Sequence, residues 1–143
     1  MKIFKAEQWN LQSLLPLFEE YRVSQGMEEN TEKTKSFLNN RIRFGESIFF
    51  IAIINQKSVG FIQLYPRLSS IHLQRYWQLT DIFVQDLNNK EKIYSALIAK
   101  AKEFVLYTQS KKLVTEQTTN QKYLLEQQGF KINTKENIFE LTI

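Results

Sequence analysis

The sequence predicts a single α/β domain with a mixed central sheet and helices on both faces. Residues 47–54 form an apolar run without alternation, which is typical of a strand that is covered on both faces. A second apolar run at 76–84 is followed by a short polar loop and by Glu91–Tyr107, where apolar residues recur at helical spacing. The short apolar segment 112–115 then completes a strand–helix–strand crossover, which implies parallel pairing of its two strands.

Composition limits the classes of protein and of site. The chain has 143 residues, 43% hydrophobic and 24% charged, which fits one globular domain over 1–143. It has no cysteine and a single histidine, His72, so we predict neither a disulfide nor a metal site. The longest apolar run, Ile48–Ile54, is too short to span a membrane, and we expect a cytoplasmic protein without membrane association. The net charge of +4 is spread along the chain, which favours a small anionic ligand over nucleic acid.

The first third of the chain predicts an edge strand and a helix. Lys2–Ala6 alternates weakly, as an edge strand does, and Asn10 is a suitable N-cap for the segment that follows. Pro16 is expected to start a turn or to kink this helix, and Gly26 to end it. The apolar residues of one buried face are Leu11, Leu14, Leu15, Phe18 and Tyr21.

A second helix is expected to open at Thr31 and to end at Gly45. Its inward-facing residues are predicted to be Phe37, Leu38, Ile42 and Phe44.

Two strands and a turn are predicted next. The strand Ser47–Ile54 leads into the polar turn 55–57 and the returning strand Ser58–Tyr65. Pro66 is expected to stop that strand, because proline cannot donate to a sheet. Arg67–Gln74 then forms a polar connection.

The end of the chain predicts one short helix and a final pair of strands. The helix begins at Asn120 and ends at Gly129, and the strands are 130–132 and 138–143.

The strand, polar loop and helix between 77 and 104 also suggest a ligand. The loop Gln85–Asn89 precedes a helix whose first N–H groups and positive dipole end suit a phosphate. Most such units bind nothing, however, and this loop lacks the glycine that usually lets a phosphate approach. Both interpretations stay open at this point.

The segments GFIQLYP, WQLTDIFV and YLLEQQGF, in this element order, resemble the GNAT superfamily of N-acetyltransferases over essentially the whole chain. The segments LFEEYR, RIRFGESIFFIA and GFIQLYPRLSS are similar to one bacterial branch. The resemblance implies a GNAT fold in which the strand Leu79–Val84 splays from the parallel strand after the long helix. The pantetheine arm of acetyl-CoA would then lie between the two strands, against Ile82, Phe83 and Val84.

The resemblance also implies a pyrophosphate loop of pattern Gln/Arg-x-x-Gly-x-Gly/Ala, which falls on residues 89–94. Here Asn89 replaces the usual first residue, and Lys92 and Tyr94 replace the glycines. Two lost contacts would weaken acetyl-CoA binding by roughly ten- to a hundredfold, or a clash would block it. Attraction between the pyrophosphate and the side chains of Lys90 and Lys92 would offset part of this loss of binding free energy. The cofactor-binding residues implied at this loop are Asn89, Lys90, Lys92, Ile93, Tyr94 and Ser95.

A second departure from the family concerns the acid that protonates the leaving thiolate. Many members carry a tyrosine four residues before the glycine of GF, and that position is Leu125 here. Tyr123 lies on a different side of the predicted helix. The asparagine that the family has earlier in this segment aligns with Thr118, and Asn120 is near it.

Asp81 is the predicted catalytic base, with Glu46 and Glu19 as further candidates. A carboxylate in an apolar strand needs a partner, so a purely structural hydrogen bond is the alternative role for Asp81. His72 is expected at the surface rather than at the site. The predicted acceptor pocket, whose members are otherwise ordinary packing residues, comprises Tyr21, Arg22, Glu46, Tyr65 and Trp77.

These observations predict an N-acetyltransferase that moves an acetyl group from acetyl-CoA to a primary amine by direct attack. A small-molecule amine or polyamine fits the minimal fold better than a protein acceptor does. The alternative is a catalytically inactive GNAT-fold binding or dimerisation module that has lost acetyl-CoA binding, and a structural partner protein without ligand is a third reading. Relatives are often dimers, so a homodimer is possible.

Overall fold

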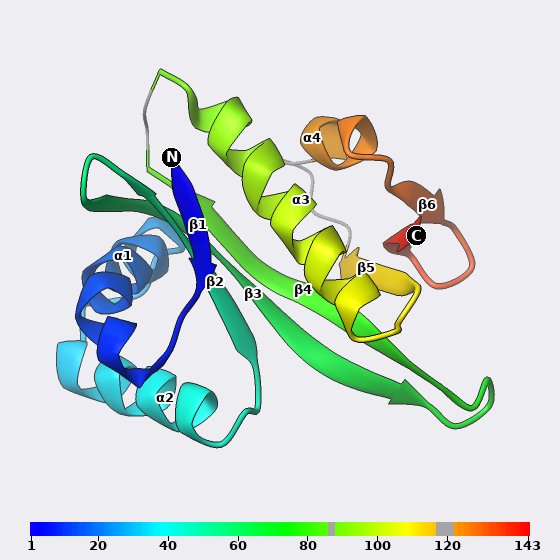
Figure 1. The fold of residues 1–143 in the computed structure, drawn as a ribbon, viewed down its shortest axis with the longest axis horizontal. Coiled ribbons are helices and arrows are strands. Elements are labelled where there is room, and N and C mark those ends of the chain that lie inside the picture. Colours follow the sequence, from blue (N-terminus) through cyan, green and yellow to red (C-terminus); the bar gives the residue numbers. More distant parts are fainter. Residues whose placement is uncertain (86–87, 117–121) are drawn as a thin grey trace.

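The computed structural model describes residues 1–85, 88–116 and 122–143. Its strands form one mixed sheet in the order β1-β2-β3-β4-β5-β7-β6 (Figure 1). Among the described strands β4 and β5 pair in parallel, and the other neighbours are antiparallel. This confirms the predicted mixed sheet. The strands are β1 Lys2–Lys5, β2 Ile48–Ile54, β3 Lys57–Ser69, β4 Gln74–Val84, β5 Lys112–Glu116, β6 Lys131–Asn133 and β7 Ile138–Thr142.

Helices cover both faces of the sheet. A short 3-10 turn, η1 (Gln8–Asn10), leads into α1 (Leu11–Ser24), and α1 and α2 (Thr31–Arg43) lie side by side on one face (Figure 1). The long helix α3 (Lys90–Tyr107) crosses the other face, next to the short helix α4 (Lys122–Gln127). The helices predicted around 10–26, 31–45 and 91–107 are therefore confirmed.

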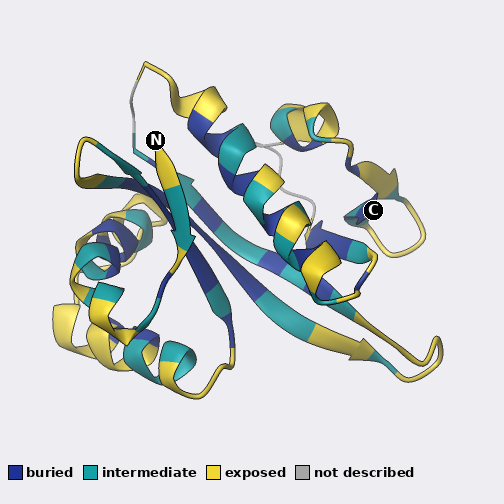
Figure 2. Ribbon diagram, in the orientation of Figure 1, coloured by how far each residue is buried: buried dark blue, intermediate teal, exposed yellow. Residues whose placement is uncertain are grey.

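The sheet separates two apolar clusters, and the buried strands between them appear dark in Figure 2. The cluster under α3 is the larger and contains Ile62, Trp77, Ile82, Leu97 and Phe139, among others. The cluster under α1 and α2 is built on Leu14, Leu17, Leu38, Phe49 and Phe61. Burial on both faces explains why residues 48–54 read as an apolar run without alternation.

Pro66 does not stop β3, and the predicted connection Arg67–Gln74 is largely a hairpin. Beyond Leu64, β3 has no pair with β2 and continues beside β4 alone, with Pro66 opposite Trp77 and Ser69 opposite Gln74. Proline is tolerated there because its missing N–H falls on the open edge of the strand.

Two aromatic residues predicted to face inward, Phe37 of α2 and Phe44 just after it, do not. The side chains of Phe37 and Phe44 are 38% and 62% exposed, whereas Leu38 is fully buried. The guanidinium of Arg41 lies 4.6 Å from the Phe37 ring centroid, and Arg43 lies 5.2 Å from that of Phe44. These cation–π contacts accommodate the exposed rings.

The first helix has Asn10 at its N-cap and ends just before Gly26, as predicted, but it differs from expectation in two details. Asn10 occupies the N-cap position of α1, but its side chain accepts a hydrogen bond from the Glu7 N–H at 2.8 Å instead of capping α1. The helix runs through Pro16, so no turn starts there. At the other end of the chain, Thr118 and Asn120 lie outside the described residues. None of the described helices has the length and apolar character that crossing a membrane requires.

Candidate active site

The parallel strands β4 and β5 separate early. Their pairing runs from Trp77 opposite Leu113 to Leu79 opposite Thr115, and β4 continues without β5 as far as Val84. The Thr115 hydroxyl donates to the Leu79 carbonyl at 2.9 Å at the point of separation. Thr80 has no partner on β3, because Gln63 pairs with Asp81 and Leu64 with Leu79, so β4 carries a β-bulge there. The predicted splay of β4 from β5 is present and begins at Thr80.

A cleft of about 560 Å³ occupies the gap between the parted strands. Its walls are the free end of β4, the start of α3, Thr115 of β5, the α4 residues Leu124 and Leu125, and the end of α1 with Tyr21, Ser24 and Gln25. The first N–H groups of α3 have no intrahelical partner, and the Asn89 side chain makes no capping hydrogen bond. Lys90 and Glu91 lie at this helix start and line the cleft, so a phosphate would meet one cation and one carboxylate.

The predicted cofactor residues divide into two groups. The residues Ile82, Phe83, Val84, Lys90 and Tyr94 line the cleft. The remaining four, Asn89, Lys92, Ile93 and Ser95, are not part of its described lining. Ile93 is buried in the core, and Ser95 accepts a hydrogen bond from Gln128 Nε2 at 2.8 Å.

The two side chains that replace the family glycines leave the cleft open. Lys92 is exposed to solvent, outside the cleft lining. Tyr94 is 2% exposed and forms part of the wall, and burial raises the pKa of its phenol well above the usual value. Leu125 also lines the cleft and is buried, as an apolar wall at the position of the missing acid. Tyr123 is 57% exposed, and its hydroxyl accepts from Gln127 Nε2 at 3.0 Å, so it does not replace that acid.

A second pocket, of about 480 Å³, lies against the same part of β4 on the side of α1 and α2. Tyr21, Gln25 and Asp81 belong to the walls of both the cleft and this pocket. The cleft and the pocket therefore have these three side chains as a common wall. The other residues that line the pocket are Phe18, Arg22, Met27, Lys33, Thr34, Phe37, Gln63 and Tyr65.

Asp81 is held by two hydrogen bonds from neutral side chains. The Tyr21 hydroxyl donates to Oδ1 and Gln63 Nε2 donates to Oδ2, each at 2.6 Å. Gln63 is itself fixed, because its Oε1 accepts from the Ser47 hydroxyl at 2.9 Å. The carboxylate is thus oriented on the shared wall without an ion-pair partner among the described residues.

The neighbouring tyrosines stay protonated. Burial, together with the hydrogen bond to Asp81 and its charge, raises the pKa of Tyr21 well above 10.0. Burial and the Asp81 charge also raise the pKa of Tyr65. Both phenols are therefore donors at neutral pH, and negative charge on this wall is concentrated on Asp81.

Three predicted acceptor residues line the pocket and two do not. Tyr21, Arg22 and Tyr65 are in the wall. Glu46 lies outside the wall and pairs with Arg41 at 3.2 Å, so its carboxylate is engaged elsewhere. Trp77 is a core residue beneath α3 and was wrongly placed in the pocket, since its Nε1–H donates to Thr108 Oγ1 at 2.9 Å.

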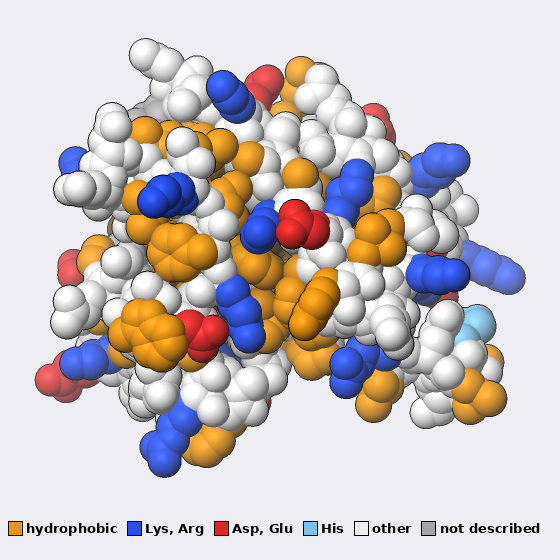
Figure 3. All heavy atoms as spheres, in the orientation of Figure 1, with side chains coloured by type: hydrophobic (Ala, Val, Ile, Leu, Met, Phe, Trp, Pro, Cys, Tyr) orange, Lys and Arg blue, Asp and Glu red, His pale blue; other side chains and the backbone are white. Residues whose placement is uncertain are grey.

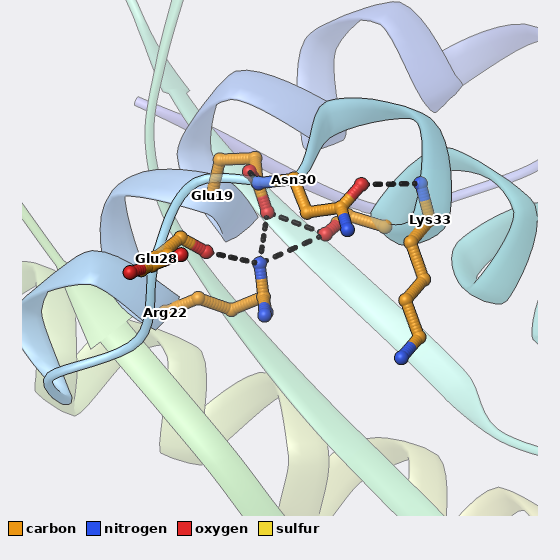
Figure 4. Close-up of polar contacts among 6 residues, drawn as sticks. Glu19, Arg22, Glu28, Asn30 and Lys33 are labelled. Carbon is orange, nitrogen blue, oxygen red and sulfur yellow. Dashed lines mark hydrogen bonds and ion pairs between the residues drawn. The ribbon is translucent and has the colours of Figure 1, made fainter.

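Glu19 accepts hydrogen bonds that hold the connection between α1 and α2, which forms the pocket rim (Figure 4). Its Oε2 accepts from the Asn30 N–H at 2.7 Å, and its Oε1 accepts from Arg22 Nη1 at 2.8 Å and from the Thr34 hydroxyl. Arg22 Nη1 also contacts the Glu28 carbonyl at 3.3 Å. Burial acts to raise the pKa of Glu19, but these hydrogen bonds outweigh it and lower that pKa. Glu19 is therefore a structural carboxylate and not the base.

Sequence reasoning missed several residues that line the pocket, and only Gln63 has a feature in the sequence that could have identified it. Gln63 is a polar residue inside an apolar strand, which is the same signal that marked Asp81. Lys33 and Phe37 come from α2, whose approach to α1 depends on the Glu19 contacts. His72 is exposed on the hairpin, with its Nδ1 2.9 Å from Ser69 Oγ, as expected of a surface residue.

The face of the molecule in Figure 3 has its Lys and Arg side chains dispersed, with acidic and hydrophobic groups between them. The described residues of this face therefore form no large patch of a single charge. The candidate site is defined instead by the cleft and the pocket beside β4.

Comparison with known proteins places the chain among acetyltransferases. A "Probable acetyltransferase" of Haemophilus influenzae is 59% identical over 144 aligned positions, which cover 100% of this chain and 99% of that protein. The "Uncharacterized N-acetyltransferase YhfO" of Bacillus subtilis is 30% identical, over 94% of this chain and 92% of its own. No sequence-family profile matches the chain.

Solved structures agree with the sequence relatives. The crystal structure of a probable acetyltransferase has a TM-score of 0.88 at 30% identity and covers 94% of this chain and 93% of its own. A "predicted acetyltransferase" of Clostridium acetobutylicum, solved with acetyl-CoA, shares the fold with a TM-score of 0.76 at 12% identity, over 94% of this chain and 92% of its own. A GNAT-family acetyltransferase of Streptococcus pneumoniae has a TM-score of 0.70 at 20% identity, over 99% and 98% of the two chains. The parted strands, the two relatives and these folds together establish that this chain belongs to the GNAT superfamily of acyltransferase enzymes.

Proposed function

We propose that this chain is a single-domain N-acetyltransferase that transfers the acetyl group of acetyl-CoA to the primary amine of a small molecule. The observation that carries the proposal is the wall of Tyr21, Gln25 and Asp81, which the cleft and the pocket have in common. An acyl donor in the cleft and an amine in the pocket would meet there without a covalent enzyme intermediate. The chain has no cysteine to form one.

The cleft supports acetyl-CoA as the donor. The edge of β4 from Thr80 to Val84 has no β5 partner, so its main-chain groups are free to hydrogen-bond an extended pantetheine arm. The open N-terminal turn of α3 and the Lys90 ammonium suit a pyrophosphate, although Glu91 reduces the local positive charge. We expect binding that is weaker than in a glycine-rich loop but not abolished.

In the proposed reaction the amine nitrogen attacks the thioester carbonyl carbon and the carbon–sulfur bond breaks. The amine loses a proton to Asp81 or to water held beside it, because Asp81 is the carboxylate on the shared wall. The leaving thiolate takes a proton from solvent. A thiol of ordinary pKa, about 8.5, leaves as a thiolate near neutral pH without a strong acid, so Leu125 slows the reaction but does not prevent it.

Two measurements test this function. Calorimetry with acetyl-CoA tests donor binding, and a thiol-detecting dye measures coenzyme A release in the presence of amines. The dye background is low because the protein contributes no cysteine. Absence of binding and of amine-dependent thiol release would contradict the proposal.

A homodimer in the cytoplasm remains part of the proposal. Its motivation is the β3–β4 hairpin, where Leu68, Ile71 and Leu73 are 79%, 90% and 90% exposed. A sedimentation experiment that finds a monomer at micromolar concentration would contradict it.

A further inference from the structure

The acceptor pocket has unpaired charges of opposite sign in its wall. Asp81 carries the negative charge, and its described partners, Tyr21 and Gln63, are neutral. Lys33 carries the positive charge, is exposed, and makes no ion pair with any described residue. In Figure 4 its side chain extends away from the Glu19 cluster.

Two other cations near the pocket are paired with carboxylates. Arg22 is balanced by Glu19 at 2.8 Å, and Arg41, near Tyr65, is balanced by Glu46 at 3.2 Å. The contacts that Arg22 makes with described residues all use Nη1, so its other guanidinium nitrogens remain able to donate to an anion beside Lys33. The pocket therefore presents a carboxylate at the cleft and cationic donors on the α1–α2 side.

The wall between these charges is apolar. Phe18, Met27 and Phe37 belong to it, and Met27 and Phe37 are 55% and 38% exposed. Exposed apolar side chains at a pocket rim lose contact with water when an apolar group covers them, which favours binding of such a group.

From this arrangement we propose that the acceptor is a primary amine that also carries an anionic group and an apolar body, as in an apolar amino acid. The amine faces Asp81 and the acetyl donor, the carboxylate faces Lys33 and the free edge of Arg22, and the apolar side chain packs on Phe37 and Met27. A polyamine fits poorly, because among the described residues of the pocket wall Asp81 is the one carboxylate, and Lys33 repels additional cations. The inference rests on the proposed acetyl transfer and names its acceptor class.

A set of matched amines tests the inference. Phenylalanine carries all three groups, phenylalaninamide and phenethylamine lack the carboxylate, and spermidine lacks both the carboxylate and the apolar body. Phosphoethanolamine carries a phosphate as its anionic group and also lacks the apolar body. We expect kcat/KM to be highest for phenylalanine and about fivefold or more lower for its amide and for phenethylamine, as loss of one partly exposed ion pair predicts. Preference for phosphoethanolamine would assign the anion to phosphate and overturn the amino-acid class.

The variant Lys33→Gln should narrow the phenylalanine-to-amide ratio, mainly through KM, and the donors of Arg22 should retain the rest of the preference. Lys35→Gln is the matched control, because Lys35 is exposed on the same helix and lies outside the pocket lining. Equal turnover of all five amines, or a ratio that Lys33→Gln leaves unchanged, would overturn the inference.

Calorimetry with phenylalanine separates the two proposals. Binding that weakens in Lys33→Gln, without thiol release, supports the acceptor class and overturns acetyl transfer. Thiol release with spermidine as the best acceptor supports acetyl transfer and overturns the acceptor class. Neither binding nor release with any amine overturns both.

Discussion

Replacing Asp81 with asparagine removes one negative charge from the shared wall and keeps the size of the side chain. The carboxylate accepts two 2.6 Å hydrogen bonds, from Tyr21 and Gln63, whereas the amide has one acceptor oxygen, so one bond becomes neutral and the other is kept only if its partner accepts from the amide NH2. Such a change costs about 1 kcal/mol per bond, so the free energy of unfolding should fall by about 2 kcal/mol. For a chain of this size that corresponds to a decrease in melting temperature of roughly 4–10 °C.

The effect of Asp81→Asn on catalysis should be larger than its effect on folding. If Asp81 receives the proton of the attacking amine, kcat should fall by about a hundredfold to ten-thousandfold. The assay is thiol release well below the melting temperature of the variant, so that the protein remains folded. Tyr21→Phe is the control, because it removes one of the two hydrogen bonds but leaves the carboxylate charged. Its kcat should stay within about tenfold of wild type.

A result that refutes the reasoning is easy to state. If Asp81→Asn melts at a lower temperature but keeps kcat within about threefold of wild type, Asp81 is a structural carboxylate. The alternative role set out from the sequence, a hydrogen bond that holds β4 to α1, would then account for its presence in an apolar strand.

Three further predictions concern stability and donor binding. Glu19→Gln should lower the free energy of unfolding by about 2–3 kcal/mol, because it leaves Arg22 without its ion-pair partner. In the wild-type protein the pKa of Glu19 is lowered by folding. Its contribution to stability is therefore present above pH 4.5 and is lost as the pH falls through the folded-state pKa. Gly60→Ala should destabilise the protein by about 1–3 kcal/mol, since an added Cβ would lie 3.0 Å from the Phe83 carbonyl oxygen in β4. Lys90→Gln should weaken acetyl-CoA binding about fivefold.

Denaturant unfolding measures the first two changes, and calorimetry measures the third. Glu20→Gln is the control for Glu19, because Glu20 is exposed and its carboxylate contacts only Gln85 among the described residues; it should change stability by less than about 0.5 kcal/mol. Lys92→Gln is the control for Lys90, since Lys92 is exposed and outside the cleft lining. Equal loss of affinity in both lysine variants would show that the cleft has been assigned to the wrong side of α3.

Alkaline pH should also destabilise the protein. The pKa of Tyr21 is raised above 10.0 in the folded state, so its contribution to stability is complete below pH 10.0 and is lost as the pH rises from there toward the folded-state pKa. Tyr21→Phe should reduce this loss, as measured by unfolding at about pH 8 and about pH 11. An identical loss in the variant would contradict the prediction.

The order of elements and the parallel pairing were predictable, because apolar periodicity records which faces are buried. The predictions that were wrong share one cause: whether a single residue is buried, exposed or paired in a strand depends on its tertiary contacts. Pro66 lies within β3 because that strand has an open edge there, and Trp77 is a core residue because α3 covers it. Phe37 is exposed at a pocket rim whose position depends on the helix pair α1 and α2. Periodicity within α2 alone does not contain that information.

The site was predictable to a similar degree. Asp81 could be found because a carboxylate in an apolar strand is unusual, and the parted strands followed from the family resemblance. The acceptor side could not be assembled from sequence, since Gln25, Lys33 and Gln63 are distant in the chain and meet only after α1 and α2 pack on the sheet.

The sheet lies between two independent apolar clusters, and this has a consequence for how the enzyme can change. In the proposed function, the donor cleft is supported by the cluster under α3, whereas the acceptor pocket is supported by the cluster under α1 and α2. Substitutions on opposite sides share few packing neighbours, so their effects on unfolding free energy should add. Substitutions in the cluster under α1 and α2 can therefore change the acceptor preference, while the cluster under α3 continues to support binding of the same donor.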